Sequence, residues 1–475
     1  MRNPNSSPMN ILLSVLLTTA VCWQASAAEP AFRPRVVVLT DISNEPDDEM
    51  SLVRFLVYSN EFDVEGIIAT TSVWLRDKVR PDLIRRTVEA YGKVQANLER
   101  NAAGFPTEKS LLELVAAGQP EFGLKGVGVG KMSEGAERLI AAADRDDPRP
   151  LWVAVWGGSN TLAQALWQVR QTRRPEAVEA FVAKLRVYTI SDQDDSGPWL
   201  RREFPGLFYV VSPSTIDSKE YHRATWTGIS GDRHSRNCPG ADFTTVSQGW
   251  LDQHIRGKGP LGSLYPKVAF LMEGDTPSFL NLIGNGLAAD ENPGWGGWGG
   301  RYELRMSYGE TRPIWSNSRD TVVGIDGKEY TSDQATIWRW RQAFQNDFAA
   351  RMDWTVKGPK EANHNPRVVV NGEQGKGVVR IKARTGQPVK ISAAGTSDPD
   401  GNKFRYFWFA YPEAGTFIGR IAVEGERNQD ATVTLSSSGT GPARGTAHVI
   451  LTVEDAGNPP MTSYRRLILD VVENQ

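Results

Sequence analysis

Short apolar runs alternate with longer amphipathic stretches over the first three quarters of the chain. Six runs are apolar enough to form buried strands, at residues 35–39, 64–69, 151–155, 185–190, 207–211 and 268–272. Other stretches repeat apolar residues at helical spacing, at residues 47–59, 82–98, 135–143, 161–171, 175–183 and 276–281. Strands separated by helices are typical of βαβ units and a mostly parallel sheet. We therefore expect an α/β fold in which right-handed crossovers bring the carboxyl ends of the strands to one edge.

The pattern changes near residue 356. Residues 357–366 are polar and rich in turn-forming residues, which predicts a linker. Beyond it apolar and polar residues alternate, and short strands are predicted at 367–370, 378–383, 389–393, 404–409, 431–435, 446–453 and 464–472. Several short strands separated by turns indicate a β-sandwich. The sequence therefore predicts an α/β domain at residues 29–356 and a β-sandwich domain at residues 367–475.

Residues 1–28 have the features of a secretory signal peptide. Arg2 is their only charged residue, an apolar stretch follows at 11–23, and small residues at 25–27 resemble a cleavage site. No later segment is long and apolar enough to cross a bilayer, so we expect a secreted or periplasmic protein without a membrane anchor. Cys238 is then the single cysteine of the mature chain, which excludes an internal disulfide. The net charge of −2 comes without a basic stripe, so nucleic-acid polymers are not expected partners.

The candidate chemistry begins in an acidic loop directly after the first predicted strand. Residues 40–49 carry five carboxylates: Asp41, Glu45, Asp47, Asp48 and Glu49. One or two acids at this place would cap the following helix and favour its dipole. Five of them repel one another beside a buried strand unless something positive is bound. A hard cation such as Ca²⁺ is the simplest candidate, because it takes six to eight oxygen ligands.

Two further junctions between a strand and a helix carry oxygen ligands. Gly157 and Gly158 follow the strand at 151–155, and glycines allow the backbone to approach a ligand closely. Asp275 follows the predicted strand at 268–272 and precedes a helix. Each junction taken alone is equally compatible with an ordinary turn and helix cap. Together they bring oxygen ligands to the same predicted edge of the sheet.

These motifs resemble those of nucleoside hydrolases. The spacing of Asp41, Asp47 and Asp48 is similar to their amino-terminal aspartate motif, residues 157–161 are similar to their Gly-Pro-Leu-Thr-Asn turn, and Asp275 resembles their late metal-binding aspartate. The amino-acid sequence around these residues resembles more closely that of a subfamily of exported bacterial proteins described as cellulose-binding. The resemblance implies a nucleoside-hydrolase-like, mostly parallel sheet flanked by helices, followed by an all-β immunoglobulin-like sandwich.

The resemblance also implies roles for individual residues. Asp48 and Asp275 would hold Ca²⁺ together with the carbonyl of Asn160. Asp41 and Asp47 would bind the attacking water or sugar hydroxyls, with one of them as general base.

The chain departs from the nucleoside hydrolase pattern at two positions. Ser43 stands where those enzymes have a second aspartate, and Gly274 stands where many of them have a histidine. Another carboxylate of the loop would then have to act as base, and the leaving group would lose its usual proton donor.

Several side chains are candidates for substrate recognition. Asn44 and Glu45 lie in the acidic loop itself. Asp192, Asp194 and Trp199 follow the strand at 185–190, where acids can bind sugar hydroxyls and an indole can stack on a ring. A solvated loop is the alternative for that segment.

A glycine-rich stretch at 295–302 carries Trp295 and Trp298, which either present flat faces to a ligand or pack in the core. Packing is the expectation that we favour for this stretch, because large aromatic side chains are more often buried than exposed.

The sequence thus leaves two functions open. The first is a secreted hydrolase of N-glycosidic or related glycosyl bonds, in which Ca²⁺ assists the attack of water on the anomeric carbon. The second is a non-catalytic protein that binds cellulose or another polysaccharide on the same scaffold. A nucleoside, a glycoside or a polysaccharide is the expected partner.

Overall fold

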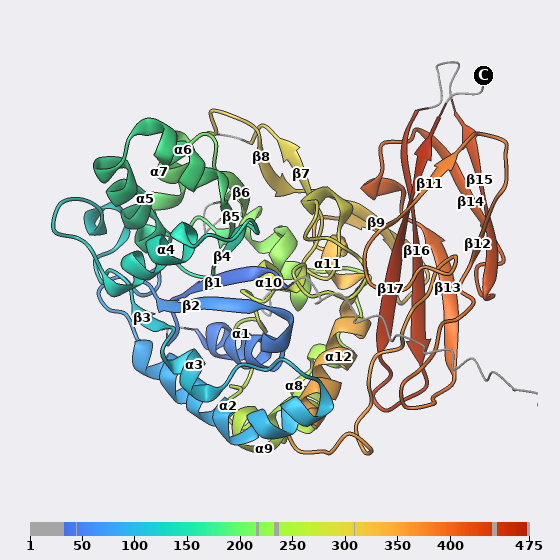
Figure 1. Ribbon diagram of the computed structural model, residues 1–475, viewed down its shortest axis with the longest axis horizontal. Coiled ribbons are helices and arrows are strands. Elements are labelled where there is room, and N and C mark those ends of the chain that lie inside the picture. The colour runs from blue at the N-terminus through green and yellow to red at the C-terminus, as the bar shows by residue number, and fades with distance from the viewer. Residues whose placement is uncertain are drawn as a thin grey trace, which may run out of the picture. The chain divides into compact units, whose positions relative to one another are not determined.

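A mostly parallel sheet runs through the first part of the computed structural model (Figure 1). The structure describes residues 33–43, 45–214, 218–231, 237–307, 309–438 and 444–472, so the predicted signal peptide and Asn44 lie outside the described residues. The strand order is β3-β2-β1-β4-β5-β6-β8-β7, and only β7 runs antiparallel to its neighbour. The strands are β1 (Arg35–Thr40), β2 (Asp63–Ala69), β3 (Val115–Ala117), β4 (Leu151–Val155), β5 (Leu185–Ser191), β6 (Phe208–Ser212), β7 (Tyr302–Arg305) and β8 (Ile314–Asn317).

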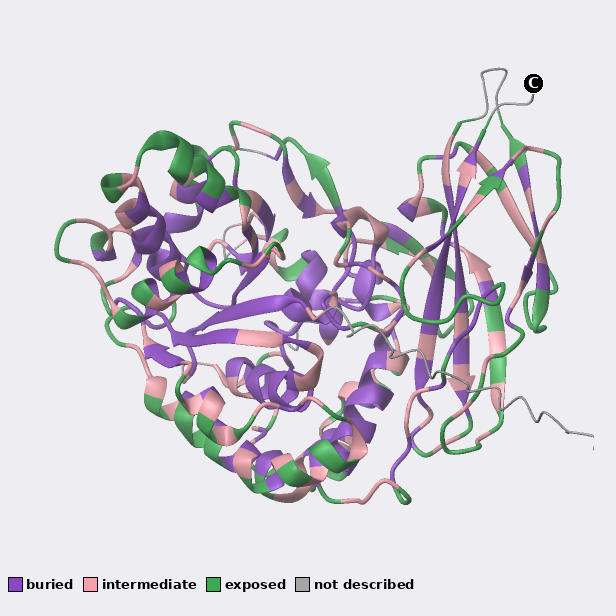
Figure 2. Cartoon of the chain, viewed as in Figure 1, coloured by how far each residue is buried: buried purple, intermediate pink, exposed green. Residues whose placement is uncertain are grey.

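Helices cover both faces of this sheet, which explains why its strands are apolar runs without alternation. In β1, Val36 and Val38 pack into one core with α1, α2 and α12, whereas Val37 and Leu39 pack into the other with α4 to α7. Figure 2 shows the strands buried and the outer faces of the helices exposed. The helices are α1 (Pro46–Val57), α2 (Pro81–Asn101), α3 (Glu108–Leu112), α4 (Glu134–Asp144), α5 (Asn160–Thr172), α6 (Pro175–Ala183), α7 (Ser196–Glu203), α8 (Gln248–Leu251), α9 (Gly259–Gly262), α10 (Pro277–Leu280), α11 (Ala335–Trp338) and α12 (Arg341–Trp354).

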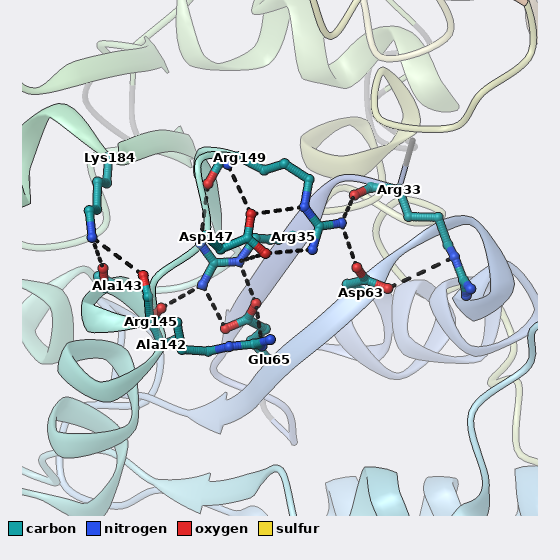
Figure 3. A network of polar contacts seen from close by, with 10 residues as sticks. All are labelled: Arg33, Arg35, Asp63, Glu65, Ala142, Ala143, Arg145, Asp147, Arg149 and Lys184. Atoms are coloured by element: carbon teal, nitrogen blue, oxygen red, sulfur yellow. Dashed lines mark hydrogen bonds and ion pairs between the residues drawn. The ribbon is translucent and has the colours of Figure 1, made fainter. Parts of the chain in front are cut away.

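An ion-pair network closes the amino-terminal end of the sheet (Figure 3). The fully buried Arg35 at the start of β1 donates to both carboxylate oxygens of Glu65 on β2, and to the carbonyl oxygens of Ala142 and Arg149. Arg149 pairs in turn with Asp63. Charged groups buried at this depth require such partners. The opposite, carboxyl-terminal edge of the strands remains available for a site.

Two smaller sheets form the C-terminal part of the described chain. A four-stranded sheet has the order β11-β17-β16-β13, and a three-stranded sheet has the order β12-β15-β14. Apolar side chains of both sheets share one core around Trp408, which makes this part a β-sandwich. The strands are β11 (Val379–Ala383), β12 (Val389–Ser392), β13 (Phe404–Ala410), β14 (Gly419–Glu424), β15 (Asp430–Ser437), β16 (Gly445–Asp455) and β17 (Thr462–Val471), and a separate hairpin is formed by β9 (Asp320–Val323) and β10 (Glu329–Ser332).

The predicted α/β class and the all-β C-terminal part are confirmed, but several elements were predicted wrongly. Residues 268–272 form no strand, because β6 pairs directly with β8 and leaves no place in the sheet for them. Residues 367–370 make only isolated bridges. Residues 276–281 contain only the single turn of α10, and the segment 191–199, for which no helix was predicted, contains the start of α7.

In the part of the chain that the structure describes, no helix combines the length and the apolar character needed to cross a membrane.

Candidate functional site

Three aspartates converge at the carboxyl-terminal edge of the parallel sheet. Asp47 and Asp48 lie in the first turn of α1, which follows β1, and Asp275 lies just before α10. One carboxylate oxygen of each lies within 4.8 Å of the others. All three side chains are buried, with exposed fractions of 8%, 4% and 4%. Segments more than two hundred residues apart thus form one acidic cluster, the name used below for these three residues.

Local signals place the two aspartates of α1. Pro46 takes the first helical position, where its fixed φ is favourable and no backbone N–H is needed. At the end of β1, the Thr40 hydroxyl donates a hydrogen bond to Oδ1 of Asp48 and accepts one from the backbone N–H of Ile42. Glu45 occupies the cap position of α1 but makes no side-chain cap hydrogen bond. Its carboxylate is therefore not used for capping.

A buried ion pair fixes the loop that carries Asp275. Arg54 on α1 donates to both carboxylate oxygens of Glu273, and neither side chain is exposed to solvent. The Tyr265 hydroxyl donates to the same carboxylate at 2.7 Å. Glu273 adopts a φ of +55°, a left-handed conformation that costs free energy for a residue with a side chain. The ion pair therefore holds a strained backbone next to the acidic cluster.

Two hydroxyl contacts complete the attachment of this loop. The Thr276 hydroxyl donates to the Ser51 hydroxyl on α1 at 3.0 Å. The Trp156 indole, directly after β4, donates to the Ser278 hydroxyl at 2.9 Å. The position of Asp275 is therefore set by side chains from α1 and from the turn after β4.

Two glycines allow the carboxylates to pack closely. A Cβ atom on Gly157 would lie 2.5 Å from Oδ1 of Asp41, and one on Gly274 would lie 2.7 Å from Oδ2 of Asp47. A side chain at either position would displace a carboxylate. The glycine turn after β4 thus lies directly against Asp41, beside the acidic cluster.

Burial and mutual repulsion raise the pKa of the three carboxyl groups of the acidic cluster and of Glu45 beside them. Burial is the larger cause for Asp47, whose pKa is raised to about 8, and the charges of Glu45 and Asp41 add to it. The pKa values of Asp48 and Asp275 lie well above their usual range, first through burial and then through neighbouring carboxylates. Burial also raises the pKa of Asp41, against the effect of a hydrogen bond with the Ser72 hydroxyl.

The acidic cluster fits a divalent cation. Oδ2 of Asp275 is buried and has no hydrogen-bond partner among the described residues. A buried carboxylate oxygen without a partner is costly, and a cation would satisfy it. Because the donors are all carboxylate oxygens, the fit is to a hard ion such as Ca²⁺ or Mg²⁺.

The remaining residues proposed from the sequence have different surroundings. The side chain of Asn160 bonds to the hydroxyls of Thr70 and Thr71 and to the carbonyl oxygen of Glu121. It thereby ties together the loops that follow β2 and β3. Asn160 is also the first residue of α5, so its carbonyl belongs to the helical hydrogen-bond ladder. We therefore leave Asn160 out of the proposed ligand set.

Asp192 and Trp199 have structural partners. Asp192 makes a bidentate ion pair with Arg201 of α7, and Arg201 also pairs with Glu310. The Trp199 ring packs edge-on against Phe204 at 5.8 Å, and the Arg170 guanidinium lies 5.4 Å from its centroid. These contacts explain why both residues are present without a ligand.

Asp194 lies against the glycine turn. Its Oδ2 would lie 2.4 Å from a Cβ on Gly158 and has no hydrogen-bond partner among the described residues. Its Oδ1 accepts from the backbone and hydroxyl of Ser196. Burial raises the pKa of Asp194 to about 6. Of the three residues proposed in this segment, Asp194 is the one whose contacts reach the turn beside Asp41.

The structure adds two aromatic residues that the sequence did not indicate. The charges of Glu45, Asp47 and Asp275 all act on the Tyr221 hydroxyl and raise its pKa, after burial. Trp226 lies beside Gly274, 3.2 Å from the position of a Cβ there. Both residues belong to the irregular chain after β6, which has no periodicity from which their position could be predicted.

Trp295 and Trp298 belong to the contact between the α/β part and the sandwich. The Trp298 indole donates to the Tyr464 hydroxyl of β17 at 3.3 Å. Arg466 of β17 donates to the carbonyl oxygen of Gly296 at 2.7 Å. The glycine-rich stretch therefore serves packing, as we favoured from the sequence.

Two family models match the chain. Residues 35–302 match the model described as "Cellulose-binding Sde182, nucleoside hydrolase-like domain", and residues 388–471 match "Cellulose-binding protein Sde0182, C-terminal domain". Among curated proteins, no significant relative is found.

One solved structure resembles nearly the whole chain. It is described as a nucleoside hydrolase-related hypothetical protein from Saccharophagus degradans that is associated with carbohydrate metabolism. It is 37% identical, with a TM-score of 0.78, over 93% of this chain and 100% of that chain. The effector XopQ complexed with adenosine diphosphate ribose is 13% identical over 69% of this chain and 96% of its own, and its TM-score of 0.30 is too low to support an inference.

Proposed function

Because the chain belongs to the Sde182 cellulose-binding family, with its nucleoside hydrolase-like domain, we propose that it is a hydrolase of glycosyl bonds that uses a divalent cation, Ca²⁺ by preference. The observation that carries this proposal is the convergence of Asp47, Asp48 and Asp275, with one buried carboxylate oxygen left without a partner. A purely structural protein has no need of three mutually repelling carboxylates in one buried place.

In this proposal Asp47, Asp48 and Asp275 are the cation ligands. Asp47, expected from the sequence to bind water or hydroxyls, joins the ligands because its carboxylate lies within reach of the other two. A bound Ca²⁺ would supply a positive charge that polarises water and orients sugar hydroxyls. Its charge would also lower the pKa values that burial and mutual repulsion raise in the cluster.

Asp41 is the proposed general base. Its carboxylate is buried against Gly157 and beside the acidic cluster, and a carboxyl pKa raised by burial suits proton transfer near neutral pH. Asp41 would take a proton from water as the oxygen of that water bonds to the anomeric carbon. The glycosyl bond breaks with its electron pair on the leaving group, which takes up a proton from solvent. Glu45 and Asn44, next to Asp41 in the loop, are proposed contacts of sugar hydroxyls.

A second function is favoured by a specific observation at Gly274. A side chain there would meet Asp47, Leu271 and Trp226, so a histidine at this position, as in many nucleoside hydrolases, would require these side chains to move. Ser43 likewise stands where those enzymes have an acid. Loss of both groups is what we would expect of a scaffold that binds polysaccharide without cleaving it.

A sugar-release assay separates the two functions. Purified protein with CaCl₂ is incubated with inosine, uridine, aryl glycosides and cello-oligosaccharides. We expect release of free sugar, and a loss of about 10²- to 10⁴-fold in Asp41→Asn, as for removal of a general base. Asp82→Asn, an exposed acid in the first turn of α2, is the matched control and keeps full activity. Calcium binding without sugar release from any substrate would reject the hydrolase and favour the binding protein.

We further propose that residues 1–28 direct export of the chain, and that residues 357–366 link an α/β domain to a β-sandwich domain. The family's description as cellulose-binding supports an extracellular place of action, because the polysaccharide is found outside the cell. Amino-terminal sequencing of protein recovered from the periplasm or medium tests the first proposal, with a new amino terminus near Ala28 as the expected result.

A further inference from the structure

Trp74 is unusual among the tryptophans because it is exposed next to the proposed site. Its exposed fraction is 42%, whereas large aromatic side chains are mostly buried. It lies in the loop that follows β2, at the same edge of the sheet as the acidic loop that follows β1.

Backbone contacts place the turn that carries Trp74 beside the glycine turn at Asp41. The Gly158 N–H donates to the carbonyl oxygen of Thr71 at 2.7 Å, and a Cβ on the neighbouring Gly157 would lie 2.5 Å from Oδ1 of Asp41. The Ser72 hydroxyl accepts hydrogen bonds from the backbone N–H groups of Trp74 at 3.0 Å and Leu75 at 3.1 Å. The backbones of Ser72 and Leu75 bond to each other in both directions, and the Leu75 side chain is buried. Trp74 is therefore carried on an anchored turn while its ring faces solvent, which keeps the entropy cost of binding low.

Tyr221 lies on the other side of the acidic cluster. It opens the short 3-10 helix Tyr221–Arg223 after β6, and the sheet order places β2 and β6 on opposite sides of β1. Trp226, against which its ring packs, lies 3.2 Å from the position of a Cβ on Gly274, and that position is 2.7 Å from Oδ2 of Asp47. Trp226 supports its ring edge-on at 5.2 Å. Two aromatic side chains thus flank the same cluster from two different loops.

From this arrangement we infer that Trp74 and Tyr221 are stacking surfaces for a neutral saccharide chain that extends across the acidic cluster on both sides. The inference rests on the proposed function, which it deepens by naming two residues that would bind the sugar rings. A pyranose ring offers an apolar face to an aromatic ring and hydroxyls to the carboxylates between them. The concentrated negative charge disfavours phosphate-bearing or acidic polymers. A nucleoside carries one sugar and would use one of the two surfaces.

Calorimetric titration with cellohexaose, in CaCl₂, tests this inference. We expect Trp74→Ala and Tyr221→Ala each to weaken cellohexaose binding about tenfold, which corresponds to about 1.4 kcal/mol, the scale of one aromatic contact. Trp74→Phe should restore most of the affinity. Trp167→Ala, which changes a half-buried tryptophan on α5, is the matched control and should leave binding unchanged. Thermal melting of each variant checks that it is folded.

Three results would overturn the inference. They are the absence of cellohexaose binding to the wild-type protein, unchanged binding in Trp74→Ala, and an equal loss for inosine and cellohexaose in that variant. The last result would assign Trp74 to a nucleobase. Calcium titration of the same samples distinguishes a failure of the proposed cation site from a failure of the proposed saccharide surface. Wild-type protein that binds cellohexaose through Trp74 but no calcium would refute the cation site and leave the saccharide surface standing.

Discussion

At the scale of single residues, burial of the acidic cluster has an electrostatic cost that a bound cation would offset. Asp47, Asp48 and Asp275 are buried together. After burial itself, the charge of Asp47 helps to raise the pKa of Asp48, and the charges of both help to raise the pKa of Asp275. Without a cation, the cluster is expected to destabilise the folded protein at neutral pH, because each group must either ionise beside its neighbours or take up a proton.

This cost predicts opposite effects of Asp275→Asn in two buffers. In EDTA the variant should be more stable than the wild type by about 1 kcal/mol or more, because one buried charge is removed at nearly constant volume. In CaCl₂ the wild type should gain stability by binding the ion, and the variant should not. Thermal denaturation in both buffers measures the difference. A variant that is destabilised in EDTA and still stabilised by calcium would contradict this prediction.

Residue types and spacing in the sequence indicated the acidic loop and Asp275, because the relevant signals are local: an apolar run, a loop of acids and a helix start. They did not indicate the surroundings of Asp192. Its partner Arg201 lies on α7 and also pairs with Glu310, which is more than a hundred residues further along the chain. Tyr221 and Trp226 could not be predicted either, because only the tertiary fold brings them to the cluster.

At the scale of elements, α1 and the loop before α10 behave as one unit. Arg54 is fully buried on the face of α1 that also carries Asp47 and Ser51, and its pairing with Glu273 joins the two segments. Gln345 on α12 and the carbonyl oxygen of Phe344 accept further hydrogen bonds from the same guanidinium. A buried pair of this kind fixes register between elements at the cost of desolvation.

Breaking this pair should be costly and should also weaken the cation site. Arg54→Met is expected to lower the free energy of unfolding by about 3–5 kcal/mol, because it leaves Glu273 as an unpaired buried charge. Arg54→Met combined with Glu273→Gln should cost less than the sum of the single changes. Urea denaturation measures these values, and Arg80→Met, at an exposed ion pair, serves as control without measurable loss. Additive losses in the double variant would show that the two residues do not act as a pair.

Elements with strong local patterns were predicted well, and weak ones were not. The range of β4 was predicted without error, whereas the three-residue β3 and the poorly alternating β14 were missed. Residues 268–272 look like a strand from their apolar side chains alone. Strand formation also requires a neighbouring strand to pair with, and that is a property of the whole sheet.

At the scale of the whole described chain, buried polar groups join the sandwich to the α/β part. Arg466 of β17 donates to the carbonyl oxygens of Leu287 and Gly296 and to the ring nitrogen Nδ1 of His448. Burial first, and then the charges of Arg466 and Arg380, lower the pKa of His448 to about 3. His448 is therefore neutral in the folded protein, where it accepts a hydrogen bond from Arg466.

The lowered pKa of His448 predicts that the folded protein loses stability in acid. Between pH 6.5 and about 3, His448 is protonated in the unfolded chain but not in the folded chain. As the pH decreases through this range, the free energy of unfolding should therefore decrease by up to about 1.4 kcal/mol per pH unit. Above pH 6.5 this residue contributes no pH dependence. His448→Gln, which can still accept from Arg466, should flatten the decline. Denaturation curves between pH 7 and pH 4 are the measurement, and an identical slope in the variant would show that other groups cause the acid sensitivity.

Calcium titration of EDTA-treated protein tests the central claim most directly. We predict that the wild type binds one Ca²⁺ per chain and that Asp48→Asn and Asp275→Asn bind it about tenfold more weakly or not at all. The control Glu49→Gln removes a charge from the same turn of α1 outside the cluster, and it should bind Ca²⁺ as the wild type does. A wild-type protein that binds no divalent cation, or an Asp275→Asn variant that binds calcium with unchanged affinity, would contradict the account.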